Sequence, residues 1–323
     1  MAAYNSNFNL ALLASAAIAS LGITCSGLQF NYPSFDKANK ADVSFSPGSG
    51  IKDGFLQITP MTGDITDRFG RVCYIRKTLN LWDSRQKHLK SFRTDFVLNI
   101  PPLQQNTTGE GMAFILTNNP SVPLNSSGQW LGIANEQTDG SPMNRVVAVE
   151  FDTRKSYEED LDSNHIGLDV NSIKSVAQDP LSNVSISLVN GFDLFVSISY
   201  HGEFRLLTVE AMQLTTRGLH VFIQAWPIDL AHHLLEDVYV GFAGSTGEFT
   251  ELNTELNQIK SWKFITIDGD DSGGGSDRKV TWFLFISLLC ACAICAICLR
   301  RRSQQRSRLP FDSIEMMKDV PSV

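Results

Sequence analysis

Short segments of alternating apolar and polar residues run through most of this sequence and restrict the chain to a fold built from β-strands. Within 184–200, the alternation stops at Asn190-Gly191 and then resumes. A period of two indicates strands with one buried face, and Asn-Gly favours a two-residue turn, so we expect a hairpin here. Further strands are expected at 92–100, 111–117, 145–153, 164–170, 204–212, 238–243 and 259–267, and one helical turn at 229–235. Because Pro and Gly separate many short strands, the sequence predicts an all-β antiparallel sandwich or jelly roll.

Two long apolar runs lie near the ends of the chain, and they predict a signal peptide and a transmembrane helix. The run over 10–23, followed by small residues, predicts a signal peptide over 1–26, with a buried core helix as the alternative. Residues 280–299 carry no charge and match the roughly 20 residues that cross a bilayer. A cleaved anchor signal is the alternative here, but the basic segment that follows favours one C-terminal transmembrane helix. We therefore expect an extracellular domain at 27–267, a flexible linker at 268–279 and a short basic cytoplasmic tail at 300–323, as in a type I single-pass plasma-membrane protein.

Charge and cysteine content narrow the function classes further. Residues 27–279 hold 21 Lys+Arg and 31 Asp+Glu, a net of −10, which argues against nucleic acid as a partner. Only Cys73 of the six cysteines lies in the expected domain, so the domain has no internal disulfide and needs a large core or a metal for stability. Glycosylation sequons at Asn106, Asn125 and Asn183 fit an extracellular location.

The most informative segment is 145–171, because it combines an acidic strand end with an acidic loop and a histidine. Glu150 and Asp152 lie two residues apart, so they share one face of a strand. Asp160 lies in the following loop, and His165 opens the next strand. Carboxylate oxygens suit Ca²⁺, and an added imidazole suits Mn²⁺ or Zn²⁺. A solvated acidic loop with a surface histidine is the alternative interpretation.

Several motifs over 27–267 resemble the legume-type lectins, and they occur in the order found in that family. They are FNYPSF (30–35), GRVCYIRKTLNLWD (70–83), GEGMAFIL (109–116), WLGIANEQTDG (130–140), AVEFDT (148–153), SNHIGLDVNSIKS (163–175), VYVGFAGSTGE (238–248) and IKSWKF (259–264). With the expected signal peptide, linker and span, the layout resembles plant lectin receptor-like kinases, without the kinase domain. The resemblance implies a flattened jelly roll of two sheets, with binding sites in the loops above a curved front sheet.

The resemblance also implies ligands for two metal ions. The family's transition-metal ligands, for Mn²⁺, correspond to Glu150, Asp152, Asp160 and His165. Its Ca²⁺ shares Asp152 and Asp160 and also takes a backbone carbonyl and an Asn side chain, which correspond to Arg154 and Ser156. Ser156 thus replaces a calcium-binding Asn, and the loop between Asp152 and His165 is one residue shorter than in well-known soluble members.

The implied carbohydrate-binding residues depart further from the family pattern. Glu110 stands at the position of the sugar-binding Asp, and Gln129 stands where many members have a Gly. Ser156 replaces the Asn that also holds sugar hydroxyls, and Arg154 stands where an aromatic residue often stacks on the sugar ring. Because losing one hydrogen-bond partner costs about 1–3 kcal/mol, we expect these changes to weaken the binding of a monosaccharide in the usual site.

The sequence therefore predicts a non-catalytic, membrane-anchored lectin-like receptor that binds an extracellular glycan. The alternative is a co-receptor or decoy that binds a protein or an apolar ligand and whose sugar and metal sites are vestigial. Jelly-roll glycoside hydrolases also carry Glu-x-Asp on a strand, but the positions of their general acid are Arg154 and Lys155, so we do not expect an enzyme. A homodimer or a receptor-kinase partner is compatible with the family resemblance.

Overall fold

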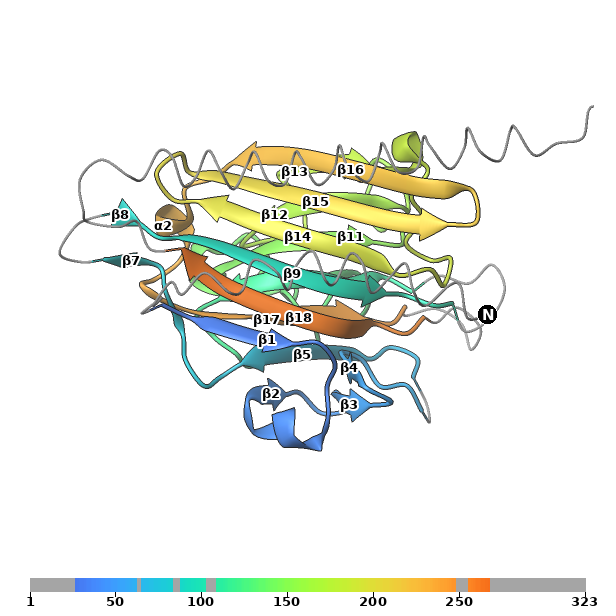
Figure 1. Ribbon diagram of the computed structural model, residues 1–323, viewed down its shortest axis with the longest axis horizontal. Helices are drawn as coiled ribbons and strands as arrows, with labels where there is room; N and C mark the ends of the chain where they lie inside the picture. Colours follow the sequence, from blue (N-terminus) through green and yellow to red (C-terminus); the bar gives the residue numbers. More distant parts are fainter. Residues whose placement is uncertain (1–26, 63–64, 84–87, 103–108, 248–254, 268–323) are drawn as a thin grey trace, which may run out of the picture. The chain divides into compact units, whose positions relative to one another are not determined.

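Two antiparallel β-sheets make up the fold, as the alternating strands predict (Figure 1). The computed structural model describes residues 27–62, 65–83, 88–102, 109–247 and 255–267. The strands of the first sheet are, in spatial order, β16 (Gly218–Pro227), β15 (Leu206–Thr215), β14 (Leu194–His201), β9 (Ser91–Asn99), β18 (Gln258–Ile267), β4 (Phe55–Gln57) and β3 (Gly50–Lys52), with β1 (Gln29–Tyr32) also paired to β18.

The second sheet lies behind the first in the view of Figure 1. Its strands are β13 (Ala177–Pro180), β12 (His165–Val170), β11 (Val146–Asp152), β10 (Gly111–Thr117), β17 (Asp237–Ser245), β5 (Phe69–Tyr74) and β2 (Val43–Phe45), with β6 (Leu79–Asn80) also paired to β17. A separate pair consists of β7 (Trp82–Asp83) and β8 (His88–Leu89). The helical turns are η2 (Lys37–Ala41), η3 (Gly128–Trp130), η4 (Pro142–Asn144), η5 (Leu181–Val184) and α2 (Leu230–His233). The all-β prediction is confirmed.

Aromatic side chains fill the space between the two sheets. Phe96 on β9 meets Phe242 on β17 edge-to-face, with ring centroids 5.1 Å apart, and Phe242 meets Trp262 on β18 at 4.8 Å. All three side chains are almost fully buried. Edge-to-face pairs contribute about 0.5–1.5 kcal/mol each beyond their buried area, so these contacts help to fix how the sheets face each other.

Strand β11 is buried on both faces, and this positions the acidic residues. Val147, Val149 and Phe151 point into the main core, whereas Val146 and Ala148 belong to a second apolar cluster on the other face of the sheet. That cluster includes Leu131, Ile133 and Ala134, which come from the segment after η3. The period of two then places Glu150 and Asp152 on the covered outer face, as the sequence predicts.

A buried arginine holds the segments that cover this outer face. Arg71 on β5 is only 3% exposed and donates hydrogen bonds to four backbone carbonyls. The acceptors are Asn119 and Ser121, both at 3.0 Å, Gly132 at 2.6 Å and Ile133 at 3.3 Å. Burial lowers the pKa of Arg71 to about 10. The guanidinium therefore replaces the hydrogen bonds that the buried loop backbone would otherwise make with water.

The hairpin predicted over 184–200 is wrong in its first half. Strand β14 begins only at Leu194, and the segment before it forms no strand. Its backbone is instead bound by side chains: Asn164 contacts the carbonyl of Ile186 and the N–H of Leu188, and Gln213 contacts the N–H and carbonyl of Ser187. Alternating Ile186 and Leu188 still enter the core, which explains the strand-like pattern.

The predicted features at the chain ends fall outside the described residues. These features are the signal peptide over 1–26, the linker, the transmembrane helix over 280–299 and the basic tail; Asn106 is likewise not described. Among the described residues, no helix is long and apolar enough to cross a membrane. Cys73 is buried and unpaired in the described domain.

Candidate metal and carbohydrate site

The ends of β11 and β12 bring three predicted metal ligands together. Asp152 pairs with His165 in the antiparallel register, and Glu150 lies two residues earlier on the same face. One ligand atom from each of Glu150, Asp152 and His165 lies within 4.8 Å of the others. Gly167 opposite Glu150 leaves room for this arrangement, because a Cβ there would lie 2.3 Å from Glu150 Oε1.

Neighbouring groups fix the orientation of these ligands. His165 Nδ1 lies 2.9 Å from the carbonyl of Asp162, whereas Nε2 lies 3.4 Å from Glu150 Oε1 and has no hydrogen-bond partner in the described part of the chain. The Ser175 hydroxyl donates to Glu150 Oε1 and also, at 2.8 Å, to Asp169 Oδ1. The second oxygen of Asp169, Oδ2, is buried without a partner. Two unpartnered polar atoms therefore accompany the cluster of buried ligands.

The buried carboxylates of the cluster would be stabilised by a bound cation. Burial, and then the charge of Glu150, raise the pKa values of Asp152 and Asp169 well above the ordinary value. Burial alone lowers the pKa of His165, but the interactions with Glu150 outweigh it, and the net shift is upward. Buried carboxylates are costly unless they are paired or bind a metal. Two carboxylates and one imidazole fit a first-row transition metal such as Mn²⁺.

The fourth predicted ligand, Asp160, is buried but stands outside this group of three. Its Oδ2 accepts hydrogen bonds from the backbone N–H groups of Ser156, at 2.9 Å, and Tyr157, at 2.8 Å. The Asp160 carboxylate thus stabilises the loop in which it lies. It still lies close enough for its charge to contribute to the raised pKa values of Asp152 and His165.

The residues predicted to bind sugar and calcium contact one another. Glu110, only 4% exposed, accepts from Arg154 Nη1 at 2.9 Å through Oε1 and from Ser156 Oγ at 2.7 Å through Oε2. The N–H of Arg154 donates to Asp152 Oδ1 at 2.6 Å. Gln129 lies on η3 and is partly exposed. These hydrogen bonds connect Glu110, Arg154 and Ser156 to one another and to Asp152 at the end of β11.

Glu255 is a site residue that the sequence reasoning missed. It is fully buried and accepts hydrogen bonds through Oε1 from the N–H of Gly111, at 2.8 Å, and the hydroxyl of Thr153, at 2.9 Å. Glu255 therefore connects Gly111, the residue after Glu110, to Thr153, the residue after Asp152. Burial raises its pKa to about 7. No periodicity in the sequence around Glu255 points to this role, whereas Asp169 shares the strand face of His165 and could have been found by alternation.

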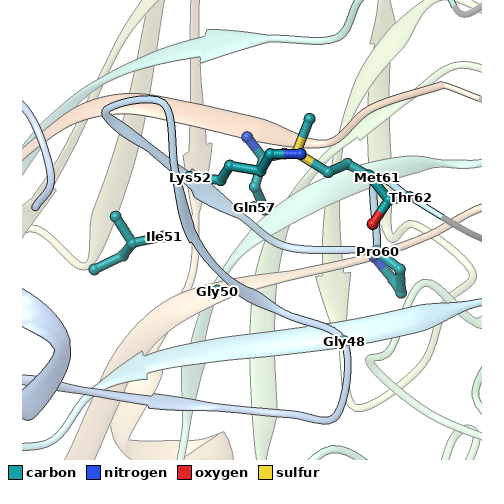
Figure 2. Close-up of a pocket in the computed structure, with 8 residues that line it drawn as sticks. All are labelled: Gly48, Gly50, Ile51, Lys52, Gln57, Pro60, Met61 and Thr62. Atoms are coloured by element: carbon teal, nitrogen blue, oxygen red, sulfur yellow. The ribbon is translucent and has the colours of Figure 1, made fainter. Parts of the chain in front are cut away.

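A shallow pocket of about 270 Å³ lies elsewhere, between β3, β4 and the segment after β4 (Figure 2). Its lining residues are Gly48, Gly50, Ile51, Lys52, Gln57, Pro60, Met61 and Thr62. The lining has one charged residue, Lys52, and no carboxylate or imidazole. The pocket lining therefore lacks the metal-binding side chains that the acidic cluster contains.

Comparisons with known proteins identify the family. The legume lectin domain matches residues 27–279. A probable L-type lectin-domain containing receptor kinase S.5 from Arabidopsis thaliana is 40% identical over 255 residues, which cover 75% of this chain and 37% of the kinase. The chain thus spans little more than a third of that relative, and 35% of a second receptor kinase, S.7, from the same plant.

Solved structures of a lectin and of a lectin-like protein have the same fold. Lectin II from Ulex europaeus is 30% identical and superimposes with a TM-score of 0.65 over 74% of this chain and 98% of the lectin. Arcelin-5, a lectin-like defense protein from Phaseolus vulgaris, is 26% identical, with a TM-score of 0.62 over 75% of this chain and 99% of arcelin-5. Legume lectins are generally non-catalytic carbohydrate-binding proteins that bind Ca²⁺ and Mn²⁺. By its motifs, its two-sheet fold and the match over 27–279, this chain belongs to the legume lectin domain family.

Proposed function

We propose that this chain is a single-pass membrane receptor whose extracellular lectin domain binds glycan through loops organised by metal ions. The observation that carries the proposal is the buried group of Glu150, Asp152 and His165, which has two carboxylates and a ring nitrogen ready for a cation. The similarity to receptor kinases and the apolar run at 280–299 support a type I protein of the plasma membrane. The chain would act without catalysis of its own.

Each site residue has a part in this proposal. Glu150, Asp152, Asp160 and His165 would hold Mn²⁺, and Asp152 and Asp160 would share Ca²⁺ with the Arg154 carbonyl and Ser156. The positive charge of the cations would offset the buried carboxylates. For the transition metal, the His165 ring is already oriented through its Nδ1 contact with the Asp162 carbonyl.

The carbohydrate would bind beside this cluster, at Glu110, Gln129 and Ser156. Glu110 directly precedes β10, whose first N–H, that of Gly111, donates to Glu255, and Ser156 lies in the loop that the Asp160 carboxylate stabilises. Because Asp160 is also a proposed metal ligand, metal binding would help to fix the positions of the polar groups that bind the carbohydrate.

A specific observation favours a second candidate function. Glu110 is only 4% exposed and each of its carboxylate oxygens already accepts a hydrogen bond from this chain, so little of the carboxylate is open to sugar hydroxyls. A co-receptor or decoy that binds a protein or an apolar ligand would need neither this carboxylate nor the metals. Such a protein would act with a receptor-kinase partner or as a homodimer.

The two candidates differ in their dependence on metal. The full chain, in detergent micelles, would be applied to a glycan array with Ca²⁺ and Mn²⁺ and again with EDTA. We expect binding to a defined glycan that disappears in EDTA and in Asp152→Asn, but not in Asp53→Asn, which removes an equal charge from an exposed turn. Folded protein that binds no glycan in either buffer would reject the lectin function and favour the second candidate.

A further inference from the structure

We infer that Arg154 determines the ligand class of this site and that the site takes glycans bearing a carboxylate group, such as uronic acids. This inference rests on the proposed glycan-binding function and names its ligand class. The guanidinium of Arg154 lies where it can meet a ligand at the end of β11, and it is held there by Glu110.

Glu110 anchors Arg154 rather than serving as a free acceptor. The carboxylate is almost completely buried, and Arg154 and Ser156 take one oxygen each. A neutral sugar mainly presents hydroxyl groups, which can accept from Arg154 but also need an acceptor for their own O–H. Sugar hydroxyls that lose water without gaining an acceptor weaken binding. The anchoring contacts therefore disfavour a neutral sugar at this position.

Arg154 retains donors for an incoming anion. A guanidinium has five N–H donors, and in the described residues only Nη1 has a hydrogen-bond partner in the protein. The side chain is 34% exposed, so its remaining donors are reachable from solvent. Guanidinium and carboxylate groups can form two parallel hydrogen bonds, a geometry that Lys cannot reproduce.

The backbone beside Arg154 limits how far the guanidinium can move. Its N–H is bound to Asp152 Oδ1 at 2.6 Å, and Nη1 is bound to a buried carboxylate. Because both ends of the residue are restrained, less side-chain freedom is lost when a ligand binds. The site is thus preorganised for a carboxylate on the solvent side of the Arg154–Glu110 pair.

Nearby acidic groups set the conditions under which an anion can bind. Glu158 is exposed and Glu159 is paired with Lys174, while Asp152, which binds the Arg154 N–H, and Asp160, which binds the Ser156 N–H, are buried. Bound divalent cations would offset the two buried aspartates, so we expect acidic glycans to bind the metal-loaded chain. Removing the charge of Glu158 should strengthen binding, and added salt should weaken the attraction of the guanidinium for the ligand.

The test compares two ligands with the same sugar chain, one carrying carboxylates and the other their uncharged methyl esters. Trigalacturonic acid and its fully methyl-esterified form would be titrated by calorimetry into the full chain in detergent micelles with Ca²⁺ and Mn²⁺. We expect the acid to bind about tenfold or more tightly than the ester, as one charge-assisted pair implies. Equal affinity for the two ligands, or no binding of the acid, would overturn the inference.

Variants assign the preference to Arg154. Arg154→Gln should lose the preference for the acid, Arg154→Lys should retain only part of it, and Glu158→Gln should increase affinity for the acid. Arg76→Gln is the matched control, because it removes one positive charge from a residue that is 63% exposed and paired with Asp42.

An unchanged preference in folded Arg154→Gln would also overturn the inference; the Lys variant gives the same comparison if the Gln variant fails to fold. Neutral-glycan binding on the array without an acid preference would leave the proposed function standing, whereas no glycan binding at all would reject both.

Discussion

Glu150 and Asp169 accept hydrogen bonds from the same hydroxyl group, that of Ser175. Both carboxylates are buried, and no N–H or O–H group of the described residues reaches the second oxygen of Asp169. Because the desolvation of each buried ion costs several kcal/mol, burial and the charge of Glu150 raise the pKa of Asp169 well above its ordinary value, and the single Ser175 hydroxyl does not offset them. This relationship supports the cation site that we propose beside the pair.

Divalent metal should therefore stabilise the native chain. A ligand that binds only the folded state at one hundred times its Kd adds about 2.7 kcal/mol to the free energy of unfolding. We expect Mn²⁺ to raise the melting temperature of the metal-stripped chain, and Asp152→Asn to remove most of this rise. The control is Asp53→Asn, which should respond to Mn²⁺ as the wild type does. Equal responses of the two variants would contradict a site at Asp152.

Glu255 should make stability depend on pH. Its pKa is about 7 in the folded chain, against an ordinary value of 4.5, because the carboxyl is buried. Between pH 4.5 and 7 the folded state binds more protons than the unfolded state, so the free energy of unfolding falls as the pH rises through this range. The full shift corresponds to about 3 kcal/mol, as an order of magnitude.

Glu255→Gln isolates this contribution from the other buried carboxyls. The variant should be more stable than the wild type at pH 8 and should show a shallower loss of stability between pH 5 and 8. Urea unfolding of both proteins in EDTA, at several pH values, measures the difference. Parallel pH profiles would show that Glu255 does not titrate in this range.

Arg71 should be a major contributor to stability although it forms no ion pair among the described residues. Arg71→Met keeps the apolar stem but leaves four buried carbonyls without a donor, and each lost partner costs about 1–3 kcal/mol. We expect a loss of at least about 3 kcal/mol by urea unfolding. The exposed control Arg76→Met should change stability by less than about 0.5 kcal/mol. A small effect of Arg71→Met would mean that water replaces the guanidinium.

Two predicted glycosylation sites are open to modification. The Asn125 and Asn183 side chains are exposed in the structure. Ser127→Ala and Ser185→Ala each remove one sequon while leaving the asparagine in place, so each should increase gel mobility by one glycan when the chain is made in a eukaryotic cell. Unchanged mobility in either variant would show that its site is not used.

Strand alternation was sufficient to predict most of the fold. The strand predicted at 111–117 is β10, and the shared face of Glu150 and Asp152 on β11 is confirmed. The same reasoning failed at 186–188, because alternation reports burial and not backbone pairing. There the side chains of Asn164 and Gln213 replace a neighbouring strand, and residues so distant in sequence give no local pattern.

The site was predictable only in part. The grouping of Glu150, Asp152 and His165 follows from strand period and register. The contact between Arg154 and Glu110 does not, because it joins residues 44 positions apart through the approach of a loop to β10. The role of Glu255 depends in the same way on contacts across the fold, with Gly111 144 positions away.

The most direct test of the metal-organised site is an electron paramagnetic resonance titration of the metal-stripped full chain with Mn²⁺. We expect the signal of free Mn²⁺ to stay suppressed until about one ion per chain has been added, and we expect Asp152→Asn to abolish this suppression while Asp53→Asn preserves it. A free Mn²⁺ signal that grows from the first addition to folded wild-type chain would contradict the account.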